Sequence, residues 1–281
     1  MLSQDMLDRL EQLRLHIHGK AQGGGGGTRA SRVRGVSAEF SDYRDYAPGD
    51  DIRRIDWNAY ARLDRLYLKQ FMEEQENICH ILLDCSRSME DKWQNALETA
   101  EALAYLALLA GDRVRIVCLR GKETRPGPLY HTRRSFEQVC AYLESCACDG
   151  KDGVEAGVLA LRELPRGMSL LISDCLQPVS MDRSLKWLQF MRQETVLIQI
   201  LADAEVHPEL EGHLNLVDSE SGEKMAVTVD RQALEAYLRT LEGFLADTAE
   251  SCRLREIPRV LLDGGDFHEK MLSGLRAAQL L

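Results

Sequence analysis

Residues 78–89 read ICHILLDCSRSM, a short apolar run that ends at an aspartate and continues into a serine-rich turn. An almost uninterrupted apolar run of this length is typical of a strand that is buried on both faces of a sheet. Residues 78–84 are therefore predicted to form a central strand. The Ala/Leu-rich stretch at 93–109 comes after the turn and is predicted to be a helix that packs on that sheet.

Strands and helices are expected to alternate through the rest of the chain. Further strands are predicted at 113–119, near 129–130 after the turn RPGP, at 168–173 and at 195–201, and helices at 135–146, 154–163 and 181–192. Such alternation predicts an α/β fold with a doubly wound, mostly parallel sheet and helices on both faces. Closer to the C-terminus we expect a small β-hairpin insertion at 213–229, a helix at 231–247, a strand at about 253–257 and a last helix at 267–278.

The composition excludes several classes of protein. Of 281 residues, 44% are hydrophobic and 28% charged, which is typical of a globular chain. Lys and Arg number 35 against 45 Asp and Glu, so the net charge of −10 argues against nucleic-acid binding. The longest apolar run, 102–110, is too short to span a membrane, and the first residues form an acid-bearing helical pattern instead of a secretory signal. We expect a cytoplasmic protein with no membrane insertion.

The first part of the chain divides into a helix, a linker and a lead-in. Residues 1–18 place apolar side chains on one helix face, at Met6, Leu7, Leu10, Leu13 and Ile17. The five glycines at 23–27 lack the preceding strand and the following Lys-Ser/Thr of a phosphate-binding loop, so they are interpreted as a linker. The predicted organisation is a helix and linker at 1–27, a lead-in segment at 28–77, and an α/β domain at 78–281.

Oxygen-bearing side chains follow two of the predicted strands. Asp84, Ser86 and Ser88 come at the end of the 78–84 strand, and Asp174 comes at the end of the 168–173 strand. In an open α/β sheet, ligands bind beyond the carboxyl ends of the strands. Carboxylates and hydroxyls suit Mg²⁺ or another divalent cation. The alternative is that Ser86 or Ser88 caps the next helix and Asp84 is a solvated strand end.

A second signature precedes this turn. It comprises the pattern Glu-Phe, Arg-x-Tyr-x-x-Gly-Asp-x-x-Arg-x-Ile-Asp-Trp, at Glu39, Phe40, Arg44, Tyr46, Gly49, Asp50, Arg53, Ile55, Asp56 and Trp57. Together with the Asp-x-Ser-x-Ser turn, this segment closely resembles the bacterial family catalogued as domain of unknown function 58. The later DSESGE (218–223) is similar to that family's Asp-x-Glu-Thr-Gly-Glu hairpin, with Ser221 in place of Thr.

The resemblance implies a von Willebrand factor A-like domain with a metal-ion-dependent adhesion site. By position, Asp84, Ser86, Ser88 and Asp174 match the ligands of that site. The family's fold adds a Thr from a later loop. Here the loop reads CDGKDGVEAGV, and the nearest match to that Thr is Asp152. An aspartate there could bind the cation directly or through water, while adding negative charge.

The functional expectation is a non-enzymatic, metal-dependent protein–protein interaction module. Members of the resembled family are commonly encoded beside MoxR-type AAA+ ATPases, which implies an adaptor that works with such an ATPase or its client. A metal-dependent hydrolase is the alternative, and a metal-free scaffold is the third hypothesis. Hydrolysis would need a base or a second metal, and the histidine closest to the ligands, His80, is expected in the core.

The eight cysteines are expected to be reduced and mostly buried, since they include no C-x-x-C pair and lack the Cys/His spacing of a zinc site. Cys85 and Cys175 each follow a proposed ligand aspartate, so we expect these two thiols to lie close together if their strands are neighbours.

Overall fold

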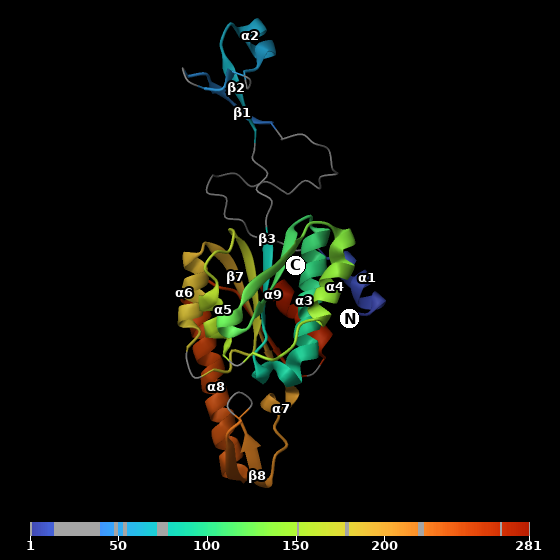
Figure 1. Ribbon diagram of the computed structural model, residues 1–281, viewed down its shortest axis with the longest axis vertical. Coiled ribbons are helices and arrows are strands. Elements are labelled where there is room, and N and C mark those ends of the chain that lie inside the picture. Colours follow the sequence, from blue (N-terminus) through green and yellow to red (C-terminus); the bar gives the residue numbers. More distant parts are fainter. Residues whose placement is uncertain are drawn as a thin grey trace. The chain divides into compact units, whose positions relative to one another are not determined.

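The computed structural model describes residues 2–13, 40–47, 50–52, 55–71, 78–150, 152–177, 180–218, 222–264 and 266–280, with the backbone alone at 40–43 and 69–71. The chain divides into two compact units (Figure 1). The main unit combines Met1–Gly19 with Asn77–Leu281, and the smaller unit is Lys20–Glu76. The first helix therefore belongs to the same unit as the α/β domain, although the lead-in separates them in sequence.

The described part of the smaller unit contains a two-stranded antiparallel sheet and one short α-helix. Strand β1 (Phe40–Asp45) pairs with β2 (Tyr67–Phe71), and α2 (Trp57–Leu63) lies between them in sequence. Asp56 begins α2, because its carboxylate accepts the backbone N–H groups of Asn58 and Ala59 at 2.9 and 3.2 Å.

The main unit is built on a six-stranded sheet with the order β10-β7-β6-β3-β4-β5. Its strands are β3 (Ile78–Asp84), β4 (Arg113–Leu119), β5 (Arg125–Tyr130), β6 (Gly167–Ser173), β7 (Gln193–Leu201) and β10 (Arg259–Asp263). All neighbouring pairs are parallel except β4 with β5. From β3 the chain proceeds outward through β4 and β5 in one direction and through β6, β7 and β10 in the other, so the strand order reverses at β3.

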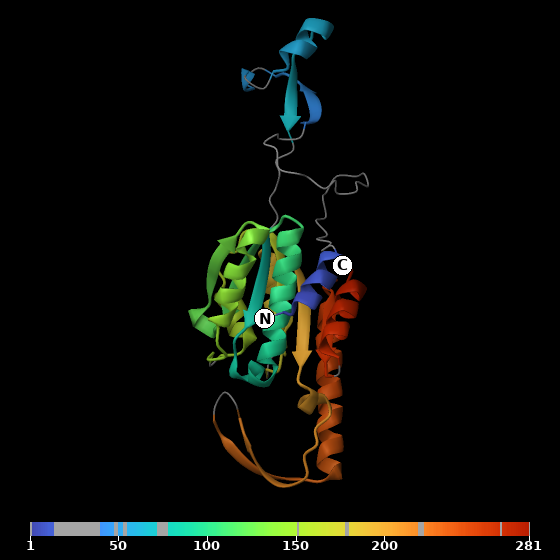
Figure 2. The same ribbon diagram turned by 90° about the vertical axis from the view of Figure 1, so that its right-hand side faces the viewer.

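Helices cover both faces of this sheet (Figure 2). One face carries α1 (Gln4–Glu11), α3 (Trp93–Leu109), α4 (Phe136–Glu144) and α9 (Phe267–Ala277); the other carries α5 (Val154–Ala160), α6 (Asp182–Phe190) and α8 (Arg231–Arg253). Alternate residues of β3 enter different core clusters, Ile81 and Leu83 the first and Leu82 the second. This alternation explains the continuous apolar run in the sequence, because both sides of the strand are buried.

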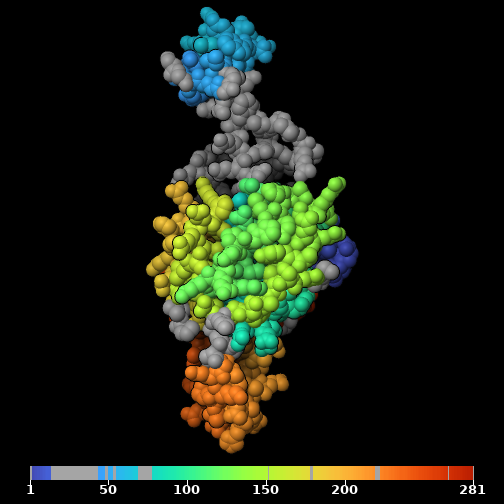
Figure 3. All heavy atoms as spheres, viewed as in Figure 1, coloured from blue at the N-terminus to red at the C-terminus, as the bar shows by residue number. Residues whose placement is uncertain are grey.

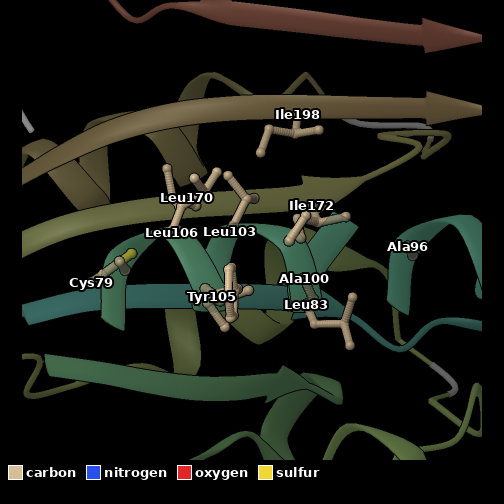
Figure 4. Packing of buried hydrophobic residues seen from close by; sticks show 14 of the residues in the cluster. Cys79, Leu83, Ala96, Ala100, Leu103, Tyr105, Leu106, Leu170, Ile172 and Ile198 are labelled. Atoms are coloured by element: carbon tan, nitrogen blue, oxygen red, sulfur yellow. The ribbon is translucent and has the colours of Figure 1, made fainter. Parts of the chain in front are cut away.

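Helix α3 is the central helix of the first face. Small side chains let it approach the sheet, and Ala96, Ala100 and Leu103 belong to the same core cluster as Leu83 and Ile172 (Figure 4). The predicted bounds of this helix and of β3 and β4 are confirmed.

A hairpin extends from the carboxyl edge of the sheet. After β7 come the short helix α7 (Asp203–Val206) and the antiparallel strands β8 (Gly212–Val217) and β9 (Lys224–Val229). The hairpin and the first turns of α8 project from the body of the main unit (Figures 1 and 3). Among the helices that the structure describes, none is both long and apolar enough to cross a membrane.

Two predicted elements were wrong. No strand forms at about 253–257, because α8 continues to Arg253 and then turns through Glu256, whose φ is 53°. The strand follows Pro258 instead, as β10. The RPGP sequence was expected to be a turn, but it forms part of β5 at the edge of the sheet.

Candidate functional site

The site centres on Asp84, the last residue of β3, at the point where the strand order reverses. Its side chain is buried, with 1% of the residue exposed. One carboxylate oxygen accepts the backbone N–H of Ser86 at 2.9 Å, and the other accepts the hydroxyl of Ser173 at 2.6 Å. Asp84 is therefore not a solvated strand end, and that alternative is wrong.

Ser86 and Ser88 stand side by side in the turn after Asp84. Their hydroxyl oxygens are 3.0 Å apart. Ser86 precedes the 3-10 helix η2 (Arg87–Lys92) but makes no side-chain bond to its amides, so it does not cap that helix. The turn is held by the backbone of Gly150, whose N–H donates to the carbonyl of Cys85 at 2.9 Å. A Cβ at position 150 would meet the same carbonyl at 2.9 Å, so this close approach requires glycine.

Asp174 follows β6, the neighbour of β3, and is also buried. One of its carboxylate oxygens accepts the N–H of Leu176 at 2.9 Å. The next residue, Cys175, has a φ of 60°, a left-handed backbone conformation that is uncommon for residues other than glycine. The side-chain amide of Gln199 on β7 donates to the Asp174 carbonyl at 2.9 Å. The neighbouring strands thus fix the position of this carboxylate.

A lysine that the sequence analysis missed completes the cluster. The Lys92 ammonium donates to the second oxygen of Asp174 at 2.8 Å and to Glu205 of α7 at 2.5 Å, with only 1% of its side chain exposed. Burial disfavours the charged ammonium, but the charges and hydrogen bonds of Asp174 and Glu205 outweigh this effect and raise the pKa of Lys92. Lys92 therefore supplies a buried positive charge at the site.

The negative charge around Asp84 is only partly compensated. Burial and the nearby charge of Asp174 raise the pKa of Asp84 to about 6, although hydrogen bonds from Ser173 and Ser86 oppose the shift. A carboxylate with a raised pKa at a strand end is a marker of a functional site.

Asp152, the remaining predicted ligand, lies in the loop between α4 and α5. It is exposed, and its carboxylate lies against Gly121, just beyond β4. The same loop reaches the turn after Asp84, because Gly150 pairs with Ser86. The structure therefore brings together Asp84, Ser86 and Ser88. It places Asp174 close enough for its charge to raise the pKa of Asp84.

Cys85 and Cys175 do not form the expected pair. Cys85 belongs to the core cluster on one face of the sheet, and Cys175 to the cluster on the other. The strands are neighbours, as expected, but the two side chains point to opposite faces.

The donor set suits a hard divalent cation in part. Neighbouring ligands of an octahedral magnesium ion lie roughly 2.9 Å apart, close to the 3.0 Å between the Ser86 and Ser88 hydroxyls. In the described part of the chain, no group of three or more His, Cys, Asp or Glu side chains is placed to hold a metal. A cation here would thus depend on Asp84 and the two hydroxyls, with Asp174 shared with Lys92.

Comparison with known proteins gives a family and distant relatives. The family described as "Protein of unknown function DUF58" matches residues 42–242. The uncharacterized protein Rv1480 of Mycobacterium tuberculosis is 26% identical over 255 residues, which cover 87% of this chain and 80% of that protein. The uncharacterized protein YeaD of Bacillus subtilis is 24% identical over 118 residues, which cover 42% of this chain and 29% of that protein.

Among solved structures, the conserved hypothetical protein BatB from Bacteroides thetaiotaomicron matches with a TM-score of 0.44 and 12% identity, covering 73% of this chain and 98% of that one. The pilus adhesin SpaC from Lactobacillus rhamnosus GG matches with a TM-score of 0.42 and 10% identity, covering 74% of this chain and 30% of that one.

Proposed function

The chain belongs to the family of proteins of unknown function DUF58, and on that basis we propose that it is a non-enzymatic protein–protein interaction module whose contact with its partner depends on a divalent cation. Mg²⁺ is the proposed cation. Asp84, Ser86 and Ser88 would hold it, and Asp174 would act as the second carboxylate. Asp152 keeps its proposed place only as the residue that matches the family's threonine position.

The observation that carries the proposal is the pair of adjacent hydroxyls beside a buried carboxylate with a raised pKa. Two buried carboxylates repel each other, and a cation between or beside them relieves that repulsion. An exposed cation with an open coordination position attracts a Glu or Asp side chain from another protein. The cation would supply this attraction, while the chain's own residues hold it at the edge of the sheet.

The finer fold assignment belongs to the same proposal. The main unit is proposed to be a doubly wound, von Willebrand factor A-like domain with the β8–β9 hairpin as an insertion. The reversal of strand order at β3 supports this assignment, because ligands of such sheets bind at the reversal point. Asp84 ends the strand at which the order reverses.

Interaction is favoured over hydrolysis by the state of the basic groups near the site. His80 is buried in β3 with its Nε2 at 2.9 Å from the Pro165 carbonyl. Lys92 is held protonated by its two carboxylates and therefore cannot accept a proton. Metal-assisted hydrolysis would need a base at the site.

The proposed partner is a MoxR-type AAA+ ATPase or its client, with this chain as the adaptor. This part of the proposal rests on the association of the family with such ATPases. A partner of that kind works in the cytoplasm, so the proposal carries a cytoplasmic location with it.

A metal-free scaffold is a second candidate, and one observation favours it. Lys92 already supplies a positive charge to Asp174, which lowers the need for a metal ion. Calorimetric titration of the full chain with magnesium chloride separates the two candidates. We expect one binding site, lost in Asp84→Ala and weakened in Ser88→Ala. Asp91→Ala is the matched control, since Asp91 is an exposed aspartate of the same turn. No binding by the unchanged chain would favour the scaffold.

Capture of a partner protein tests the proposal that contact with the partner depends on the cation. A purified MoxR-type ATPase should be retained by the immobilised chain in Mg²⁺ and released by EDTA. Because EDTA also strips the ATPase, Asp84→Ala is the deciding variant: it should lose capture while its circular dichroism spectrum stays unchanged. Equal capture by Asp84→Ala would contradict the proposal, and Mg²⁺-dependent phosphatase turnover that needs Asp84 would favour the hydrolase.

A further inference from the structure

Three thiols converge where β3 and β4 end. Cys118 of β4 lies opposite Leu83 of β3 in the sheet. Leu83 is two residues before Cys85 in the sequence. The sulfur of Cys146, just beyond α4, is 2.9 Å from the sulfur of Cys118. The Cys85 thiol also forms a hydrogen bond with Cys118. Cys118 is therefore at the centre of the group, between a thiol from its neighbouring strand and one from the loop after α4.

The surroundings of Cys118 stabilise its thiolate. Hydrogen bonds from Cys146 and Cys85 hold the pKa of the Cys118 thiol well below its usual range, and the Arg120 guanidinium adds to the effect against the opposing influence of burial. Arg120 also forms an ion pair with Asp149, whose carboxylate oxygen is 3.3 Å from the guanidinium. A cation thus stands next to a thiol cluster, which is the microenvironment of reactive cysteines.

Cys140, Cys175 and Cys252 lack these conditions. Burial raises the pKa of Cys252 to about 11 and of Cys140 to about 11. Cys175 is fully buried, and burial raises its pKa as well. These thiols stay protonated at neutral pH and are poor nucleophiles.

The three thiols of the cluster also differ in their exposure to solvent. Cys118 and Cys146 are 8% and 9% exposed, whereas Cys85 is 0% exposed. Cys118 and Cys146 thus keep a small exposed fraction, and Cys85 keeps none. Cys146 lies beyond the end of α4, in a connecting segment, and is the partner whose sulfur contacts Cys118. Cys85 is enclosed at the strand end, where its thiol donates to the Leu83 carbonyl at 3.5 Å.

We propose that Cys118 and Cys146 form a peroxide-reactive dithiol, with Cys118 as the nucleophile and Cys146 as the resolving thiol. The Cys118 thiolate attacks one oxygen of hydrogen peroxide, the O–O bond breaks, and hydroxide leaves with a proton from the Cys146 thiol as water. Cys118 is then a sulfenic acid. The Cys146 thiolate attacks its sulfur, the S–S bond forms, and the departing hydroxide takes a proton from solvent to give a second water. Two thiols are oxidised by two electrons, and one peroxide is reduced to two waters.

The dithiol lies next to the proposed cation site without being part of it. Cys146 begins the segment that leads to Gly150, and Gly150 binds the turn between Asp84 and Ser86 through the Cys85 carbonyl. The chemistry of the dithiol does not rest on the proposed function, so it can be tested without a metal or a partner.

Graded oxidation of the unaltered full chain tests the proposal. The chain is treated with increasing hydrogen peroxide, its remaining thiols are alkylated, and the unreduced digest is mapped by mass spectrometry. We expect the Cys118–Cys146 disulfide to be the first product, formed about tenfold faster than any other thiol is oxidised, and fully reversed by dithiothreitol. Uniform oxidation of the thiols, or a first disulfide between other cysteines, would overturn the proposal.

Variants assign the two roles. In Cys146→Ser the reaction should stop at the sulfenic acid of Cys118, which dimedone traps. Cys118→Ser should remove the fast phase altogether. Cys252→Ser is the matched control, because Cys252 is a buried thiol of the opposite core cluster, and it should leave the rate unchanged. A fast phase that survives in folded Cys118→Ser would contradict the assignment, and the map of the unaltered chain decides if that variant does not fold.

Discussion

Lys92 joins two carboxylates that are far from it in the chain. Asp174 is 82 residues away and Glu205 is 113 residues away, and they follow different strands. The remaining oxygen of Glu205 accepts the N–H of Ala202 at 2.7 Å, so Glu205 also fixes the start of α7. One ammonium thus connects the end of β6 to the segment that leads into the hairpin.

Replacing this lysine by a neutral side chain of similar length should be costly. Lys92→Met leaves Asp174 buried without its cation, and we expect the free energy of unfolding to fall by about 3–5 kcal/mol in urea titrations without metal. Because Asp174 is then free, Mg²⁺ should bind about tenfold more tightly, which corresponds to about 1.4 kcal/mol. Lys92→Met combined with Asp174→Asn is the control, since it removes both charges and should regain much of the stability. Unchanged magnesium affinity in Lys92→Met would show that Asp174 takes no part in cation binding.

His80 makes the fold sensitive to acid. Burial lowers the pKa of His80 to about 4, helped by the charge of Arg115 and opposed by the hydrogen bond to Pro165. The unfolded chain takes up this proton near 6.5, the ordinary value for histidine. The stabilisation from neutral His80 is therefore complete above pH 6.5 and is lost as the pH falls toward 4. The shift corresponds to about 3 kcal/mol.

Urea unfolding at pH 7.5 and pH 4.5 measures this effect. His80→Gln keeps a donor for the Pro165 carbonyl but cannot titrate, so its stability should fall less between the two pH values than that of the unaltered chain. Carboxylates that titrate in the same range affect both proteins equally. The difference between the two losses of stability therefore gives the contribution of His80. Equal losses of stability in the unaltered chain and in His80→Gln would contradict the role assigned to His80.

At the scale of elements, hydrophobic patterning identified the central strands well. The run at 78–84 and the strand at 113–119 formed with the predicted bounds, because each is buried between two layers of helices. The end of α8 could not be predicted in the same way. Nothing in the sequence between 247 and 253 breaks a helix, and Leu254, which lies inside the predicted strand, is 65% exposed.

The candidate site was predictable only where its residues are close in sequence. Asp84, Ser86 and Ser88 form one local turn, and the neighbouring positions of β3 and β6 explain Asp174. Lys92 follows two acidic residues in MEDKW, a pattern typical of a solvated turn, so no local signal indicated its burial. The Cys118–Cys146 contact was missed for a similar reason, since it depends on where α4 ends beside β4.

At the scale of the whole molecule, the first helix completes a core made by residues after 77. Met6 and Leu10 of α1 are buried in the first core cluster, and the N–H of Leu2 donates to Glu101 of α3 at 2.8 Å. The hydroxyl of Tyr105, also on α3, donates to Glu11 at 2.7 Å. The main unit is thus discontinuous in sequence, and the lead-in unit is inserted between its first helix and its first strand.

This arrangement predicts that α1 stabilises the distant domain. Leu10→Ala should lower the free energy of unfolding by about 2–5 kcal/mol, because Leu10 is 0% exposed. Leu7→Ala is the matched control on the same helix, where the side chain is only half-buried, and its effect should be clearly smaller. Urea unfolding followed by tryptophan fluorescence measures both. Equal small losses would mean that α1 contributes little to the core.

The outermost strand β5 has a consequence for association between molecules. Pro126 and Pro128 carry no backbone N–H, so two of the four residues from 125 to 128 cannot donate to an incoming strand. An open sheet edge is otherwise a template on which strands of other molecules can add and grow into fibres. The prolines interrupt that template along β5. We therefore expect strand addition at the edge formed by β5 to be unfavourable, even at high protein concentration.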